Sequence, residues 1–187
     1  MQSLIQRGIK FSEVNMDDLE TSEHTKLKPL SISIVVSKHD RKILGFRVSR
    51  IPARGLIAEK SRQKYGYRKD ERPENLDQLF EQISPLVAKD ALISTDSNPL
   101  YPIPIQKHLG CAHFASLSRK ASIAGQGELK EGGHDPLFAI NHTCAMFRAN
   151  LSRLIRRTWC TTKKIESLID HISIYVMFHN RELTKAI

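Results

Sequence analysis

Residues 30–37 read Leu-Ser-Ile-Ser-Ile-Val-Val-Ser, and residues 43–51 read Ile-Leu-Gly-Phe-Arg-Val-Ser-Arg-Ile. The first run begins with alternating apolar and polar residues and the second alternates around Gly45, so each predicts a β-strand. The sequence Lys-His-Asp-Arg at 38–41 lies between them, which predicts a hairpin. We expect a shorter strand at residues 11–16, directly before the acidic pair Asp17 and Asp18.

The middle of the chain predicts two helices and one more strand. Residues 56–65 are typical of a short basic helix. A second helix begins at Pro73 and ends near Pro85. Its apolar residues recur every three or four positions: Leu76, Leu79, Phe80, Ile83 and Leu86. Residues 91–95 form a short buried-strand pattern that stops at Asp96, in the turn-forming sequence Asp-Ser-Asn-Pro.

The last third of the chain predicts a loop followed by two helices. Residues 118–136 contain four glycines among polar neighbours, which indicates a mobile loop. The strongest helical pattern starts at Pro136, and its apolar face would be Leu137, Ile140, Cys144, Phe147, Leu151, Leu154 and Ile155. A final helix over 163–184 would bury Ile165, Leu168, Ile169, Ile172, Tyr175 and Val176. This order of elements predicts an α/β fold in which helices cover a mixed sheet.

Composition predicts one domain and a polyanionic partner. The chain has 187 residues with 40% hydrophobic content, enough for one core. Its 29 Lys and Arg exceed its 20 Asp and Glu, giving a net charge of +9. Residues 41–72 hold eleven basic against three acidic residues, and residues 148–165 hold six against none. The candidate phosphate contacts are Arg54, Lys60, Lys64, Arg68, Lys69, Lys130, Arg153, Arg156, Arg157, Lys163 and Lys164.

The cysteines and the hydropathy pattern bear on location. The three cysteines form no Cys-X-X-Cys pair, which is typical of a reduced intracellular protein. His108, Cys111 and His113 lie close in sequence but lack a fourth zinc ligand nearby, so we interpret them as ordinary loop and strand residues. No apolar run approaches the roughly 20 residues that span a bilayer, and the first ten residues lack a signal-peptide core. We therefore expect a cytoplasmic, nucleoid-associated protein without a membrane partner.

Three positions carry side chains suited to phosphodiester chemistry. Such chemistry uses two divalent ions, and Mg²⁺ prefers hard oxygen ligands. Asp17 after the first strand and Asp96 after the fourth would meet if those strands are neighbours. Asn141 and Arg148, seven residues apart, would share one polar face of the Pro136 helix. Each residue also has a simpler interpretation: Asp96 as a turn residue, Asp17 as part of a solvated acidic corner and Asn141 as an exposed helix residue.

Four strings taken in order resemble insertion-sequence transposases of the DDE superfamily. They are Asp-Asp-Leu-Glu-Thr at 17–21, Thr-Asp-Ser-Asn-Pro-Leu-Tyr at 95–101, Gly-Gln-Gly-Glu-Leu-Lys at 125–130, and Asn-His-Thr-Cys-Ala-Met-Phe-Arg-Ala-Asn-Leu-Ser-Arg-Leu-Ile-Arg-Arg-Thr at 141–158. The resemblance runs from about Phe11 to Asn180, and its most specific part is the segment from Asn141 to Lys163.

The resemblance implies a ribonuclease-H-like catalytic domain over residues 11–187. It also implies two Mg²⁺ or Mn²⁺ ions, hydrolysis at the element's ends, strand transfer into target double-stranded DNA, and a homo-oligomer as the active complex. Asp17 and Asp96 match the first two metal ligands. Asn141 stands where the superfamily commonly has glutamate, with Arg148 at the usual basic position. An amide binds a hard cation less well than a carboxylate, so Glu128 and Asp135 remain rival third ligands.

The start of the chain departs from the family pattern. The family usually has an N-terminal DNA-recognition module, and residues 1–10 are too few to form one. We expect either the second part of a split reading frame or a remnant. Function therefore has three hypotheses: an active transposase domain, an inactive remnant or regulator that only binds DNA, and a ribonuclease that uses the same metal site.

Overall fold

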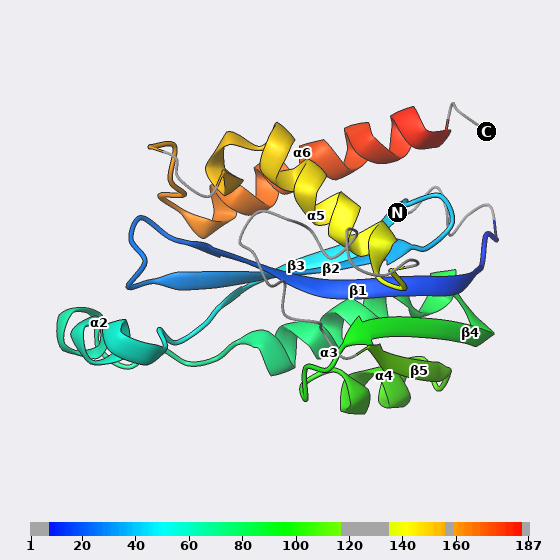
Figure 1. Cartoon of the computed structure of the whole chain (residues 1–187), viewed down its shortest axis with the longest axis horizontal. Helices are drawn as coiled ribbons and strands as arrows, with labels where there is room; N and C mark the ends of the chain where they lie inside the picture. Colours follow the sequence, from blue (N-terminus) through cyan, green and yellow to red (C-terminus); the bar gives the residue numbers. More distant parts are fainter. Residues whose placement is uncertain (1–7, 117–134, 156–158, 185–187) are drawn as a thin grey trace.

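The computed structural model describes residues 8–116, 135–155 and 159–184 as an α/β fold with one five-stranded mixed sheet between helices (Figure 1). The strands are β1 (Phe11–Ser22), β2 (Pro29–Ser37), β3 (Ile43–Arg50), β4 (Val87–Asp96) and β5 (Ala112–Ser116). The α-helices are α2 (Ala58–Tyr65), α3 (Arg72–Ile83), α4 (Pro102–His108), α5 (Phe138–Asn150) and α6 (Ile165–Thr184). The 3-10 turns are η1 (Gly55–Ile57), η2 (Ser84–Leu86) and η4 (Ser152–Leu154). The predicted α/β class and mixed sheet are thus confirmed.

The sheet has the strand order β3-β2-β1-β4-β5. β1, β2 and β3 form an antiparallel meander, whereas β4 and β5 run parallel to β1. The predicted hairpin is confirmed: Leu30 pairs with Arg50 and Val36 with Ile43. At its turn, Arg41 adopts a left-handed backbone with a φ of 57°.

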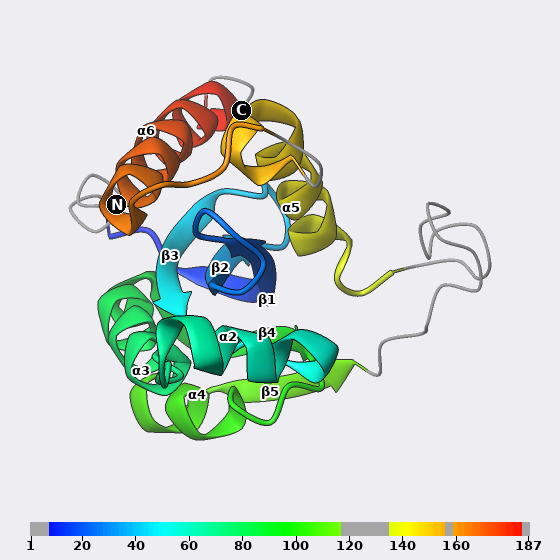
Figure 2. The same cartoon turned by 90° about the vertical axis from the view of Figure 1, so that its left-hand side faces the viewer.

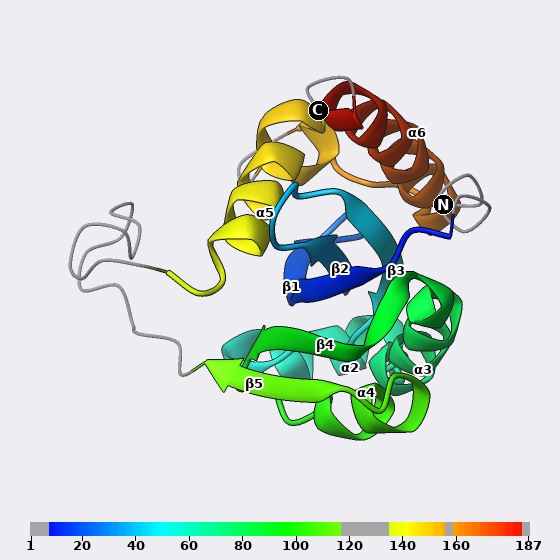
Figure 3. The same cartoon turned by 90° about the vertical axis from the view of Figure 1, so that its right-hand side faces the viewer.

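Helices cover both faces of the sheet (Figures 2 and 3). Because side chains alternate along a strand, β1 and β2 contribute to two cores. Leu19 and Ile34 pack with Phe147 of α5 and Leu168 of α6, whereas Met16 packs on the other face with residues of α3 and α4. β2 is buried along almost its whole length, as expected for a strand covered on both sides.

Several elements differ from the sequence predictions. β1 extends to Ser22, so Asp17 and Asp18 lie within the strand rather than after it. β4 begins at Val87, four residues earlier than predicted. The sequence interpretation missed α4 and β5. α4 is only seven residues long, and β5 is an edge strand without a fully buried residue, so neither has enough periodicity to be recognised.

The two C-terminal helices also differ in detail. α5 ends at Asn150, and the chain continues through η4, which still buries Leu154. The prediction that Ile155 and Ile169 are buried is wrong, since both side chains are exposed. Residues that share a helical face need not be covered equally, because burial depends on the neighbouring elements. The predicted loop at 118–136 lies almost entirely outside the described residues. No described helix has the length and apolar character needed to cross a bilayer.

Candidate functional site

The structure brings Asp17 and Asp96 together on neighbouring parallel strands. Met16 of β1 pairs with Thr95 of β4, so the next residue on each strand is an aspartate. Paired residues of parallel strands point to the same face of a sheet, and these two carboxyls lie on the face that α5 covers. The sequence predicted that the two aspartates meet if the first and fourth strands are neighbours, and β1 and β4 are neighbours in the sheet.

Asp17 occupies an unfavourable environment for a carboxylate. Burial raises its pKa from 3.8 to about 7, and the negative charges of Asp96 and Asp18 add to the rise. The backbone N–H of Asp18 donates a hydrogen bond to Asp17 Oδ1 at 2.7 Å, which lowers the pKa in part, as does the charge of Arg148. Near neutral pH, Asp17 is therefore either protonated and uncharged or ionised, and a cation bound beside it would favour the ionised form.

Asp18 points to the opposite face of β1. The hydroxyl of Ser33 donates a hydrogen bond to Asp18 Oδ1 at 2.5 Å. Asp18 Oδ2 is buried and has no hydrogen-bond partner among the described residues. Burial raises the pKa of this carboxyl, and the nearby Arg72 guanidinium opposes the rise. The Arg72 guanidinium in turn donates hydrogen bonds to both carboxylate oxygens of Asp70.

A cavity of about 750 Å³ opens where β4 ends beside the second half of β1. We call it the aspartate pocket; its lining is Asp17, Asp18, Glu20, Arg54, Arg72, Asp96, Ser97, Asn98, Pro99 and Leu100. The ends of parallel strands are where α/β sheets commonly bind ligands. Four carboxyls and two guanidiniums line the pocket, so it can hold a cation beside an anion.

Helix α5 places Arg148 and Cys144 over Asp17. The charge of Asp17 acts on Cys144, and that of Arg148 acts on both residues. Burial, with a smaller contribution from Asp17, raises the pKa of the Cys144 thiol to about 12. The thiol is therefore neutral and packs as an apolar residue.

Asn141 is engaged elsewhere in the structure. Its amide Nδ2 donates a hydrogen bond to Asp135 Oδ2 at 2.9 Å, and Asp135 Oδ1 accepts the backbone N–H of Leu137 at 2.8 Å. Neither Asn141 nor Asp135 lines the aspartate pocket. Within the described ranges, no group of three or more His, Cys, Asp or Glu side chains is placed to hold a metal ion. Glu128, the other rival ligand, lies outside those ranges.

The residues of the suggested Cys/His cluster have separate partners. His108 contacts Asp77 at 2.8 Å, and His113 contacts the hydroxyl of Thr95 at 2.9 Å. Cys111 is buried in the core beneath α3 and α4.

The predicted phosphate contacts divide into engaged and exposed side chains. Arg68 donates hydrogen bonds to the carbonyls of Ile51 and Pro29 and pairs with Glu23 at 3.6 Å. It therefore links the start of β2 to the residue that follows β3. Lys69 pairs with Glu74. Lys163 is exposed and lies within hydrogen-bond distance of Thr161 and His24. The other described members are exposed or half-buried: Arg54, Lys60, Lys64, Arg153 and Lys164. Lys130, Arg156 and Arg157 lie outside the described residues.

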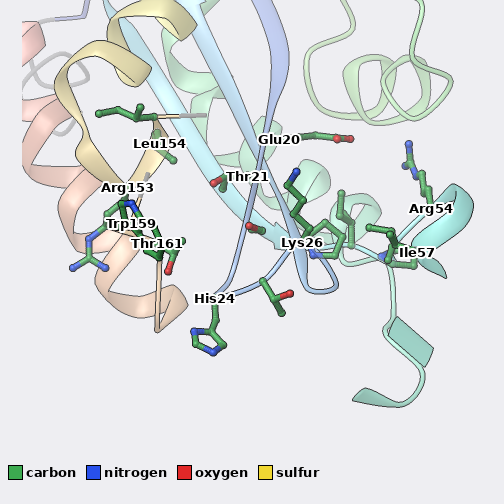
Figure 4. Close-up of a pocket in the computed structure, with 17 residues that line it drawn as sticks. Glu20, Thr21, His24, Lys26, Arg54, Ile57, Arg153, Leu154, Trp159 and Thr161 are labelled. Atoms are coloured by element: carbon green, nitrogen blue, oxygen red, sulfur yellow. The ribbon is translucent and has the colours of Figure 1, made fainter. Parts of the chain in front are cut away.

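A second cavity, of about 760 Å³, shares two lining residues with the first. Figure 4 shows the side chains that line it. We call it the tryptophan groove. Its described walls are the end of β1 with the following turn, the segment 51–57, the stretch 153–155, and the residues Trp159 and Thr161. Glu20 and Arg54 line both cavities. The sequence interpretation did not single out Trp159 or Arg72. Trp159 could have been noticed because it is the single tryptophan of the chain.

The described chain is thus a five-stranded α/β protein in which Asp17, within β1, lies beside Asp96 at the end of the adjacent parallel strand β4. No protein-family model, no curated protein and no solved structure matches it.

Proposed function

We propose that this chain is the catalytic domain of a DNA transposase, with a ribonuclease-H-like fold and a metal-dependent phosphodiester site at Asp17 and Asp96. The observation that carries the proposal is the juxtaposition of these two aspartates on β1 and β4. The strand order, with an antiparallel meander beside two further parallel strands, supports the fold assignment.

The residues present fit a divalent cation. Asp17 is a largely buried carboxyl whose pKa is raised by burial and by two further aspartates, and it has no ion-pair partner within 4.0 Å among the described side chains. Carboxylate oxygens are the ligands that Mg²⁺ and Mn²⁺ prefer. When bound, such ions stabilise the attacking and leaving oxygens of an in-line displacement at phosphorus.

The chain's own side chains would position the DNA around these carboxylates. Asp17 and Asp96 would hold the cations on the α5 face, and Arg148, whose charge acts on Asp17, would provide a guanidinium for the phosphate. In hydrolysis, a water oxygen bonds to phosphorus and the bond to the 3′ oxygen breaks, leaving a 3′ hydroxyl and a 5′ phosphate. In strand transfer, that 3′ hydroxyl attacks a target phosphorus and displaces the target's 3′ oxygen.

A second candidate is a protein that binds DNA without cutting it. The observation that favours it is the engagement of Asn141 with Asp135, outside the aspartate pocket. If neither residue reaches the ions, the site has only two firm carboxylate ligands. In that case the basic surface would still bind DNA, with an affinity that falls steeply with salt concentration.

Cleavage of labelled duplex DNA in the presence of Mn²⁺ tests the proposal. We expect cutting by the wild-type chain, loss of cutting in Asp17→Ala and Asp96→Ala, and no change in Asp90→Ala, which removes an exposed carboxyl from the same strand β4. Asn141→Ala reports whether the amide contributes. An RNA substrate of the same sequence, if cut faster than DNA, would indicate a ribonuclease.

Absence of cutting together with salt-sensitive DNA binding would favour the second candidate. Equal activity in wild type and Asp96→Ala would exclude the aspartate site as the catalytic centre. A chain that binds no DNA at low salt would contradict both candidates.

A further inference from the structure

The tryptophan groove begins where the aspartate pocket ends. Glu20 and Arg54 belong to both cavities. Glu20 follows Asp17 by three residues on β1, which places its backbone about 10 Å further along the strand. Because Asp17, Asp96 and Glu20 line one pocket and Glu20 also lines the groove, a DNA strand whose phosphate lies at Asp17 and Asp96 is within this distance of the groove.

The groove has an excess of positive charge. Lys26, Arg54 and Arg153 line it, together with His24, and among the described lining residues Glu20 alone is acidic. Within the described part of the chain, none of the three cations lies within 4.0 Å of an acidic side chain in an ion pair. Figure 4 shows Arg153 on one side of the groove and Arg54 on the other, with Lys26 between them. Such an arrangement is complementary to successive phosphates of one strand.

The groove also presents an aromatic side chain to solvent. Trp159 is 99% exposed, and the apolar side chains of Ile57 and Ile155 in the lining are exposed as well. An indole ring beside unpaired cations is the combination with which proteins bind single strands, because each base can stack on an aromatic face. Bases within a duplex stack on each other and offer no free face.

The size of the groove points to an unpaired segment as well. Its volume of about 760 Å³ falls in the range of sites that enclose small ligands. A nucleotide fits in such a volume, whereas a duplex can only lie across its mouth.

We propose that the tryptophan groove binds an unpaired segment of DNA next to the aspartate pocket: one base stacks on Trp159, and the flanking phosphates contact Arg153, Lys26 and Arg54. This inference rests on the proposed function, since it assumes that a DNA strand passes Asp17 and Asp96. In this proposal the groove binds the end of a DNA strand that has separated from its complementary strand.

The single tryptophan makes the test direct, because all intrinsic tryptophan fluorescence comes from Trp159. The purified chain is titrated in EDTA with four probes: a short mixed-sequence single strand, the blunt duplex of the same sequence, an abasic strand of equal length, and a poly-glutamate peptide. Affinity is measured in parallel by fluorescence anisotropy of the labelled probe. Because divalent ions are absent, cleavage does not enter the measurement.

We expect the single strand to quench Trp159 and the other three probes to leave its emission unchanged. Trp159→Ala should weaken single-strand binding by about 5- to 150-fold. Tyr67→Ala is the matched control, since Tyr67 is an exposed aromatic residue outside the groove, and it should bind as wild type. Arg153→Ala should reduce the salt dependence of binding, whereas Arg181→Ala, which alters an exposed arginine near the end of α6, should not.

Three results would overturn the proposal: no quenching by the single strand, equal quenching by the abasic strand or the peptide, or equal losses in the Trp159 and Tyr67 variants. These results are separable from failure of the proposed function. A chain that cuts DNA with Mn²⁺ but shows no quenching refutes the groove alone. A chain that shows the expected quenching but never cuts DNA retains the groove and refutes the catalysis.

Discussion

Replacing Asp17 by asparagine should stabilise the metal-free protein. Burial, Asp96 and Asp18 together raise the pKa of Asp17 from 3.8 to about 7. The carboxyl thus binds its proton more tightly in the folded chain than in the unfolded chain. At a pH where the carboxyl is ionised in both states, this difference lowers the free energy of unfolding. One pKa unit corresponds to about 1.4 kcal/mol, so the full penalty is about 4 kcal/mol and is present above pH 7.

The sign of this effect fixes the pH window. As pH rises from about 4 to about 7, the unfolded chain has already lost the Asp17 proton while the folded chain still holds it, so the free energy of unfolding of the wild type falls. Asp17→Asn removes this dependence. Its advantage over the wild type should therefore be small near pH 4 and largest near pH 8, where we expect a melting temperature on the order of 10 °C higher.

The assay is thermal unfolding followed by circular dichroism at pH 4, 6 and 8, in EDTA and again with Mn²⁺. Asp90→Asn, which neutralises an exposed carboxyl on β4, is the control and should not show this pH-dependent gain. Mn²⁺ should raise the melting temperature of the wild type more than that of Asp17→Asn, because only the wild type keeps both carboxylates. An Asp17→Asn chain that is less stable than wild type at pH 8 would refute this account of the buried charge.

Three further outcomes follow from the packing and the ionisable groups. Phe147→Ala, which empties a fully buried position of α5, should cost about 3–5 kcal/mol in chemical denaturation; a loss below 1 kcal/mol would mean that the helix does not pack as described. Arg68→Ala should destabilise the chain more than Lys69→Ala in the same experiment, because Arg68 holds two backbone carbonyls inside the fold whereas Lys69 makes an exposed ion pair. A disulfide reagent at pH 8 should modify the exposed Cys160 well before Cys144, whose pKa burial raises to about 12; mass spectrometry that finds Cys144 modified first would contradict this.

The fold was predictable where local patterns are strong. The hairpin of 30–37 and 43–51 and the helix from Pro73 follow from the spacing of apolar residues, and the structure confirms them. α4 and β5 were missed because seven and five residues are too few to display a period. The lengthening of β1 to Ser22 has a non-local cause: pairing with β2 continues to Pro29, so the partner strand holds the mostly polar segment 17–22 extended.

The candidate site was predictable only in its residue types. The sequence by itself determined that a strand ends at Asp96, because turn formers act locally, whereas its prediction that the first strand stops before Asp17 was wrong. Only the tertiary structure decided that β4 pairs with β1 in parallel, that Arg148 lies near Asp17, and that Asn141 binds Asp135. Strand order and burial arise from packing between segments distant in the chain, and no local pattern records which segments become neighbours.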